Sequence, residues 1–141
     1  MEETTAQTAA RLRRAITRLN RKLRGTAPDG VSPGQASMLA SIAKLENPSL
    51  GDLALAEHIQ PPSVTRLVRD MQRDGLITCV PDAEDRRCTR VSLTAAGRRE
   101  LDTIRKKKAE FLEQRLLTLS LDDQRRAREA AAFLDTLLED E

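Results

Sequence analysis

Hydrophobic positions recur along the chain at helical spacing, and prolines and glycines interrupt them at a few places. Between residues 5 and 24 the apolar positions are three or four apart, which predicts an amphipathic helix with one narrow apolar seam. That seam consists of Ala9, Leu12, Ile16, Leu19 and Leu23. After a loop over residues 25–30, a second helix is expected to begin near Pro33 and to stop at Asn47-Pro48. Its expected buried positions are Met38, Leu39, Ile42, Ala43 and Leu45.

Two further helices are predicted on either side of the pair Pro61-Pro62. Ser49 followed by Asp52 has the spacing of a capping box, which begins the first of them. Its short apolar face consists of Leu50, Leu53, Ala54 and Ala56. The prolines end that helix and suit the first turn of the next one, because neither has an amide hydrogen to lose there.

The helix from Pro62 to Arg73 separates an apolar face from a basic one. The inward positions follow the spacing i, i+3, i+4 and i+7 and are Val64, Leu67, Val68 and Met71. The opposite side presents Pro62, Ser63, Arg66, Arg69 and Arg73, with Thr65 at its flank. Short polar groups and arginines are what a helix in the DNA major groove needs, although an ordinary solvated face has the same composition.

A β-hairpin is expected after Gly75. Residues 76–80 are β-prone, and residues 90–93 alternate apolar and polar side chains. The charged segment 81–88 between them is too long for a two-residue turn and suits a projecting wing. A long helix is expected from Thr94 onward, and Ser120 with Asp123 predicts the start of another. The apolar positions of this part are Leu101, Ile104, Phe111, Leu112, Leu116, Leu119, Ala127, Ala130, Ala131, Leu134, Leu137 and Leu138.

The predicted fold is mainly α with a small β-hairpin wing, in other words a winged helix-turn-helix flanked by terminal helices. Residues 49–97 are expected to form the DNA-binding region of a single subunit, and residues 5–48 and 98–141 to serve mainly in dimerisation and support. The apolar stripes of the terminal helices exceed what a small winged domain covers, so a homodimer is expected.

Composition narrows the possible partners. Of 141 residues, 39% are apolar and 33% charged, and the net charge of +2 is too small to indicate nucleic-acid binding by itself. The only aromatic residues are Phe111 and Phe133, which argues against base stacking on single strands but leaves duplex DNA open. No apolar run could span a membrane, the N-terminal sequence lacks a signal-peptide pattern, and there are two cysteines. We therefore expect a cytoplasmic protein without a membrane partner.

No arrangement of residues predicts an enzyme, a metal site or a cofactor. His58 is the only histidine, and the two cysteines and one histidine do not provide a ligand set. The arginines and lysines of residues 11–24 and 105–108 are interpreted as solvated faces. The alternative is a supporting phosphate contact for residues 11–24 and a long-range attraction to DNA for residues 105–108. Cys88 follows Arg86 and Arg87 and is a candidate for oxidation, so a redox-responsive regulator is one alternative function. A helical protein-interaction module is the other.

Two segments resemble the MarR family of winged-helix transcriptional regulators. They are PPSVTRLVRDMQRDGLI, residues 61–77, and PDAEDRRCTRVSLTAAG, residues 81–97. The second contains the Asp-x-Arg wing, the Leu-Thr strand end and the following glycine that are typical of the family. Here these residues are Asp85, Arg87, Leu93, Thr94 and Gly97.

The resemblance implies a role for each part of the interface. Arg87, held by Asp85, would enter a minor groove, while Ser63, Thr65 and Arg66 would face the major groove. Many relatives have Asp-Arg where this chain has Arg69-Asp70, so Arg69 would take over that contact. The predicted DNA-binding set is Pro62, Ser63, Thr65, Arg66, Arg69, Arg73, Asp85, Arg86, Arg87 and Arg90. The resemblance also implies a ligand-responsive repressor that acts as a homodimer on a palindromic, inverted-repeat operator and binds a small-molecule effector.

Overall fold

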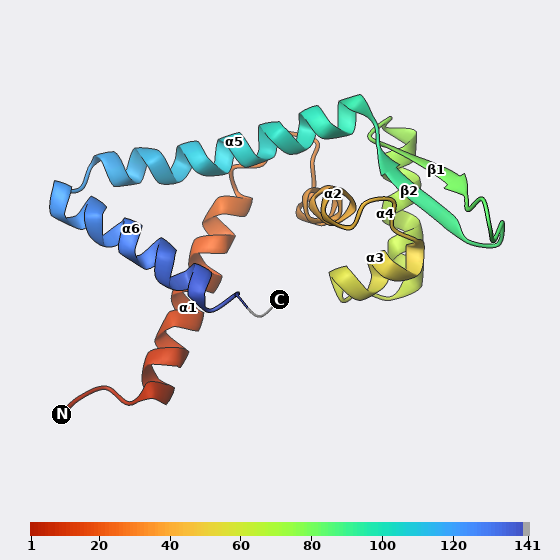
Figure 1. The fold of residues 1–141 in the computed structure, drawn as a ribbon. Helices are drawn as coiled ribbons and strands as arrows, with labels where there is room; N and C mark the ends of the chain where they lie inside the picture. The colour runs from red at the N-terminus through yellow and green to blue at the C-terminus, as the bar shows by residue number, and fades with distance from the viewer. Residues whose placement is uncertain (140–141) are drawn as a thin grey trace.

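The computed structural model describes residues 1–139, which form six helices and one antiparallel hairpin (Figure 1). The elements in chain order are α1 (Thr5–Arg24), α2 (Pro33–Leu45), α3 (Leu50–Glu57), α4 (Pro61–Arg73), β1 (Ile77–Pro81), β2 (Thr89–Leu93), α5 (Ala95–Leu117) and α6 (Leu121–Thr136). The predicted mainly helical fold with a small hairpin is confirmed. In Figure 1, α2, α3, α4 and the hairpin gather at one end of α5, and α6 folds back from its other end.

Local sequence signals begin each helix. The hydroxyl of Ser49 accepts the amide hydrogen of Asp52 at 3.0 Å, and the Asp52 carboxylate accepts the Ser49 amide at 3.0 Å, which confirms the capping box. Thr4 and Ser32 form equivalent reciprocal caps with glutamines. Ser120 caps α6 by accepting the Asp123 amide hydrogen at 3.1 Å. Pro61 and Pro62 occupy the first turn of α4, which begins without a side-chain cap.

One hydrophobic core lies between α2, α3, α4, the hairpin and the first half of α5. Its buried members are Ala36, Met38, Leu39, Ile42, Leu53, Val64, Val68, Met71, Ile77, Val91, Leu101 and Ile104. We call this unit the winged lobe. It extends beyond the predicted stretch 49–97, because α2 supplies four of the core residues and α5 supplies Leu101 and Ile104.

The strand end and α5 are joined by a compact set of backbone contacts. The Thr94 hydroxyl donates to the Gly75 carbonyl at 2.6 Å and accepts from the Gly97 amide at 3.0 Å. The Thr94 amide donates to the Leu76 carbonyl at 3.0 Å. The Leu-Thr-x-x-Gly pattern therefore has a structural role, which is to cap α5 and fix it against the start of β1.

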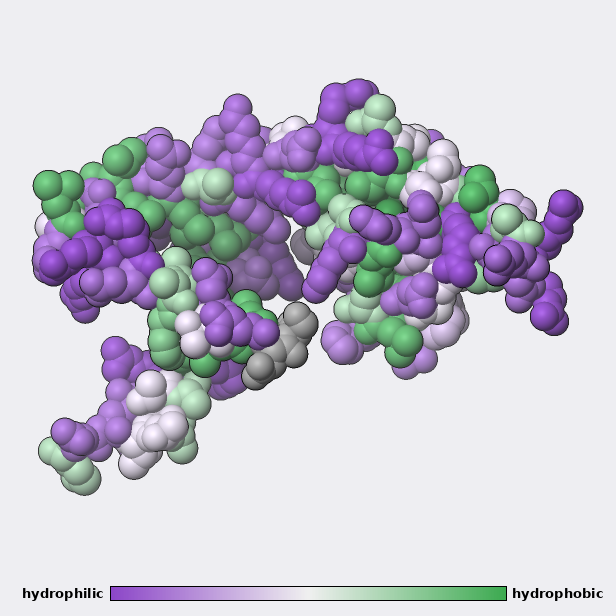
Figure 2. Space-filling model, viewed as in Figure 1, coloured by the Kyte–Doolittle hydropathy of each residue, from purple (hydrophilic) through white to green (hydrophobic). Residues whose placement is uncertain are grey.

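The terminal helices contribute little to the core. Neither α1 nor α6 has a buried residue. Several large apolar side chains on these helices, from the end of α5 to the start of α6 and just after α6 are more than 40% exposed: Ile16, Leu19, Leu117, Leu119, Leu121, Phe133, Leu137 and Leu138. Figure 2 shows apolar surface gathered over the α5–α6 end and polar surface over the projecting hairpin.

Two sequence expectations about burial are wrong, and so is one about the length of the last apolar stripe. Leu45 is 41% exposed because it is the last residue of α2, and Ala56 is exposed on the outer side of α3. Leu137 and Leu138 do not extend the stripe of α6, because that helix ends at Thr136 and both leucines lie in the turn that follows. Within residues 1–139, no helix is long and apolar enough to cross a membrane.

Candidate nucleic-acid interface

The exposed face of α4 carries the predicted major-groove residues. Val64, Val68 and Met71 anchor the helix in the core, so the opposite side points away from it. Pro62, Ser63, Thr65, Arg66, Arg69 and Arg73 are all exposed. Ser63 and Thr65 lie in the first half of the helix, and the Thr65 hydroxyl donates to the Pro61 carbonyl at 3.1 Å. The serine and threonine side chains are short, so they allow close approach to base edges.

The three arginines of this face differ in how far they are already engaged. Arg73 lies 3.5 Å from Asp70 and 3.6 Å from Asp74, measured between side-chain nitrogen and carboxylate oxygen. In the part of the chain that the structure describes, Arg66 and Arg69 form no ion pair. Arg66 and Arg69 are therefore the arginines of α4 whose guanidinium groups need not leave a carboxylate to meet a phosphate or a guanine.

The wing projects from the same end of the molecule as α4 (Figure 1). Its two strands pair in register from Ile77 opposite Leu93 to Pro81 opposite Thr89. Arg87 lies in the connecting loop, and its side chain is 92% exposed. The Asp85 carboxylate accepts from the Arg87 amide at 3.1 Å and from Arg87 Nε at 3.2 Å, which leaves the two terminal nitrogens of the guanidinium free of that contact. Asp85 thus contacts Arg87 as the resemblance implied. Arg86 beside it is also exposed.

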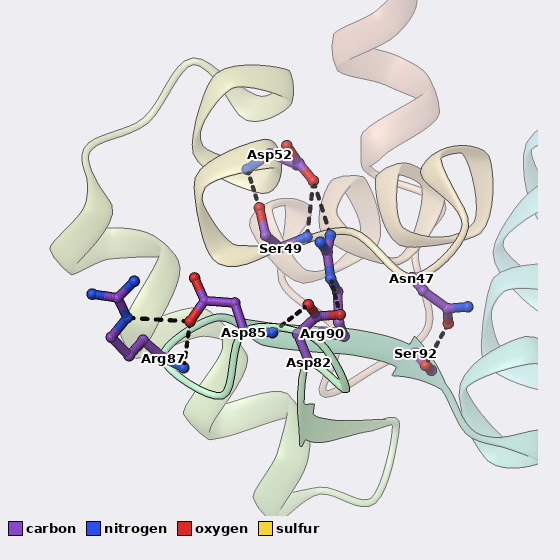
Figure 3. A network of polar contacts seen from close by, with 8 residues as sticks. All are labelled: Asn47, Ser49, Asp52, Asp82, Asp85, Arg87, Arg90 and Ser92. Atoms are coloured by element: carbon purple, nitrogen blue, oxygen red, sulfur yellow. Dashed lines mark hydrogen bonds and ion pairs between the residues drawn. The ribbon is translucent and has the colours of Figure 1, made fainter.

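Arg90 has a different environment from the other predicted site residues (Figure 3). Its side chain is 36% exposed, and its Nε donates to the Asp82 carboxylate at 3.3 Å. Its Nη1 lies 3.7 Å from the Asp52 carboxylate on α3. The hydrogen bond to Asp82 raises the pKa of Arg90 above its ordinary value. The structure therefore places Arg90 inside the protein's own polar network, and a DNA contact by Arg90 stays a prediction.

The two acids of this network were not among the predicted site residues. The Asp82 carboxylate accepts the Asp85 amide hydrogen at 3.1 Å, and that bond, followed by the bond and charge of Arg90, lowers the pKa of Asp82. The Asp52 pKa is lowered chiefly by its hydrogen bonds from Ser49. Asp52 was recognised as a capping residue only. Its contact with Arg90 joins residues far apart in the chain, and no local spacing signals it.

The structure places the residues considered for chemistry at the end of a helix, in a strand and at the end of the wing loop. His58 ends α3 in a left-handed conformation, with φ 53° and ψ 42°. Cys79 lies half-buried in β1, and burial raises the pKa of its thiol. Cys88 is a free, half-buried cysteine at the end of the wing loop, and its amide donates to the Asp85 carbonyl at 2.9 Å. Residues 1–139 contain no group of three His, Cys, Asp or Glu side chains placed to hold a metal ion.

Known proteins resemble this chain in both sequence and fold. A model described as the MarR family matches residues 31–89. A helix-turn-helix-type transcriptional regulator of Mycobacterium leprae is 32% identical over 141 residues, which cover 99% of this chain and 99% of that protein. A Pseudomonas aeruginosa structure, described as a transcriptional regulator, matches with a TM-score of 0.80 at 34% identity and covers 97% of this chain and 98% of that one. BpsR of Bordetella bronchiseptica, whose DNA binding is regulated by 6-hydroxynicotinic acid, has the same fold, with a TM-score of 0.66 at 23% identity over 94% and 98% of the two chains.

Proposed function

The chain belongs to the MarR family, and from this premise we propose that it is a transcriptional regulator that binds double-stranded DNA sequence-specifically. One observation carries the proposal. The helix α4 is anchored by a buried apolar face and presents Ser63, Arg66 and Arg69 outward, beside a wing whose Arg87 is 92% exposed. A helix and a hairpin arranged in this way can occupy adjacent grooves of one duplex.

Each part of the interface would have its own task. Short side chains at the start of α4 would let the helix approach the base edges, and Arg66 would fork onto a guanine or grip a phosphate. Arg87 would enter the minor groove, where the negative potential attracts a guanidinium group. Residues 49–97 would therefore make the DNA contacts, and the core contributed by α2 and α5 would keep them in place.

We further propose that two copies act together as a homodimer on an inverted-repeat operator. The support is the exposed apolar surface of the α5–α6 turn and the terminal helices, including Leu117, Leu121 and Phe133, which are 62%, 82% and 57% exposed. Surface of this kind is usually covered in solution. A molar mass of twice the chain's 15.7 kDa, measured by light scattering, is the expected result. A monomer at micromolar concentration would contradict it.

A ligand-responsive repressor is the form of regulation that we propose. The fold is shared with BpsR, whose DNA binding responds to 6-hydroxynicotinic acid, and an effector here would be a small molecule that changes the spacing of the two winged lobes. DNA affinity would fall when the effector binds, because only one spacing fits both half-sites.

The deciding experiment is selection of genomic fragments bound by the purified protein, followed by titration of the best fragment at several salt concentrations. We expect an inverted repeat to be enriched and the affinity to fall steeply with salt, since phosphate contacts release counterions. The matched control is a duplex of the same length and composition with one half-site scrambled. Equal binding to both duplexes would contradict the inverted-repeat operator, whereas no enrichment and no salt-sensitive binding would overturn the proposal and favour a protein-interaction module.

A further inference from the structure

A continuous chain of polar contacts runs from the first turn of α3 to the arginine of the wing (Figure 3). Asp52 of α3 pairs with Arg90, Arg90 donates to Asp82, and Asp82 accepts from the Asp85 amide. Asp85 in turn accepts from both the amide and the Nε of Arg87. Every link is a charged or charge-assisted contact, so the geometry of each one restricts the next.

Backbone contacts place Arg90 at the joint between the wing and the rest of the lobe. Arg90 forms an antiparallel bridge with Ser49, the cap of α3, and the Val91 amide donates to the Pro48 carbonyl at 2.9 Å. Ser92 of the same strand donates to the Asn47 side chain at 2.7 Å. The segment 47–49 is therefore joined to β2 by one isolated bridge and two further hydrogen bonds, and the Arg90 side chain spans from this joint to the wing loop.

We infer that Arg90 is a positioning residue, which fixes the wing on α3 through Asp52 and Asp82 and thereby sets where Arg87 meets DNA. This inference rests on the proposed DNA-binding function. Two observations distinguish Arg90 from a DNA contact. Its side chain is 36% exposed whereas that of Arg87 is 92% exposed, and its guanidinium already faces two carboxylates.

The variant Asp82→Asn separates positioning from simple electrostatics, because the two make opposite predictions. Removing a negative charge beside the wing should tighten DNA binding if only overall charge matters. An asparagine can still accept the Asp85 amide hydrogen with its carbonyl oxygen, but it loses the ionic contact with Arg90. Positioning therefore predicts weaker binding by Asp82→Asn, and tighter binding would overturn the inference.

The variant Arg90→Gln is expected to weaken operator binding about three- to tenfold, and its effect on the salt slope of the affinity is decisive in the Arg87→Ala background, where the slope should stay unchanged. An arginine that contacted a phosphate would also lower that slope by about one, as expected for Arg87→Ala. Arg125→Gln is the matched control, because it removes an arginine paired to Asp122 at 2.5 Å on α6, away from the winged lobe. A reduced salt slope when Arg90→Gln is added to Arg87→Ala would show a direct contact and contradict the inference.

A double-mutant cycle tests whether Arg90 acts through Arg87. In the Arg87→Ala background, Arg90→Gln should cause little further loss of affinity, whereas independent roles would give additive losses. Hydrogen exchange of the free protein gives a second readout. Arg90→Gln should speed exchange of the Asp85, Arg87 and Cys88 amides and leave α4 protected. Additive losses, or uniform loss of protection across the lobe, would show a merely structural role.

The inference and the proposed function fail in different ways. If the wild-type protein binds no duplex in a salt-sensitive manner, the proposed function is wrong. If the wild type binds and Arg90→Gln binds equally well, only the positioning role is wrong.

Discussion

Gly97 of α5 lies so close to the backbone of Leu76 that a methyl group in place of its hydrogen would come within 2.0 Å of the Leu76 carbonyl oxygen. That oxygen accepts the Thr94 amide hydrogen, and Thr94 caps the same helix. Position 97 therefore needs a glycine because α5 comes very close to the start of β1 there. The φ of Gly97 is not positive, so the requirement is steric and does not come from an unusual backbone conformation.

Gly97→Ala should consequently destabilise the protein by about 2–3 kcal/mol, because backbone atoms rather than a flexible side chain must move. Urea unfolding followed by circular dichroism measures this change. Gly51→Ala is the matched control, since its Cβ would meet only the Ser49 hydroxyl oxygen at 3.7 Å. That variant should be about 0.5–1 kcal/mol more stable than wild type, from helix propensity. Equal effects of the two substitutions would contradict the steric account.

His58→Gly should increase stability by about 0.5–1 kcal/mol, since the residue adopts a left-handed conformation that glycine populates without steric cost. His58→Ala provides the comparison, because it removes the imidazole and keeps the Cβ. We expect the alanine variant to show none of the gain. Thermal unfolding of both variants at one protein concentration would decide, and a loss of stability in His58→Gly would assign a structural task to the imidazole.

Arg66→Ala and Arg87→Ala should weaken DNA binding in different ways. If Arg66 reads a base, its loss should weaken the free energy of operator binding by about 1–3 kcal/mol and relax the base preference at one position of the operator. Arg87→Ala should weaken binding to sites of many sequences and make the salt dependence shallower. Titrations with an operator and with single-base variants measure both. Wild-type affinity in the two variants would refute the proposed interface.

The stability of the winged lobe should depend on pH through Asp52. Hydrogen bonds from the Ser49 amide and hydroxyl hold the pKa of Asp52 below its ordinary value of 3.8. The Asp52 carboxylate therefore binds a proton less readily in the folded protein than in the unfolded chain. Its contribution to the free energy of unfolding is complete above the unfolded pKa and is lost as the pH falls through the lower folded pKa. Asp52→Asn should flatten the fall of the unfolding free energy below about pH 4. Asp29→Asn, in an exposed loop, should leave that fall as it is in wild type.

The two cysteines offer a separate test of their surroundings. Burial raises the pKa of Cys79, so at pH 8 less of it is thiolate than of a free cysteine. In a Cys88→Ser variant, the remaining thiol should therefore react with a disulfide reagent more slowly than free cysteine does.

If Cys88 senses oxidants, peroxide treatment should weaken DNA binding of wild type but not of Cys88→Ser. Equal sensitivity of the two proteins would exclude that role.

Local periodicity predicted the helices well, because the caps and faces are encoded by neighbouring residues. The Ser49–Asp52 box and the inward face Val64, Val68 and Met71 are both confirmed. The environment of Arg90 was not predictable in this way. The packing of β2 against α3 brings Asp52 to Arg90, and the pairing of β1 with β2 brings Asp82 to it. Strand alternation alone makes Arg90 resemble any outward arginine. The packing of α2 into the core was not predictable in this way either, because residues from later in the chain bury its apolar face.

In the proposed homodimer, the absence of buried residues in α1 and α6 would make stability depend on protein concentration. For the proposed homodimer, pairing and ordering of these helices would be one linked equilibrium, and the unfolding midpoint would rise with protein concentration. The number of molecules in a cell would then set both how many operators are filled and how long each free subunit persists. Autoregulation, in which such a protein limits its own synthesis, would act on the two quantities together.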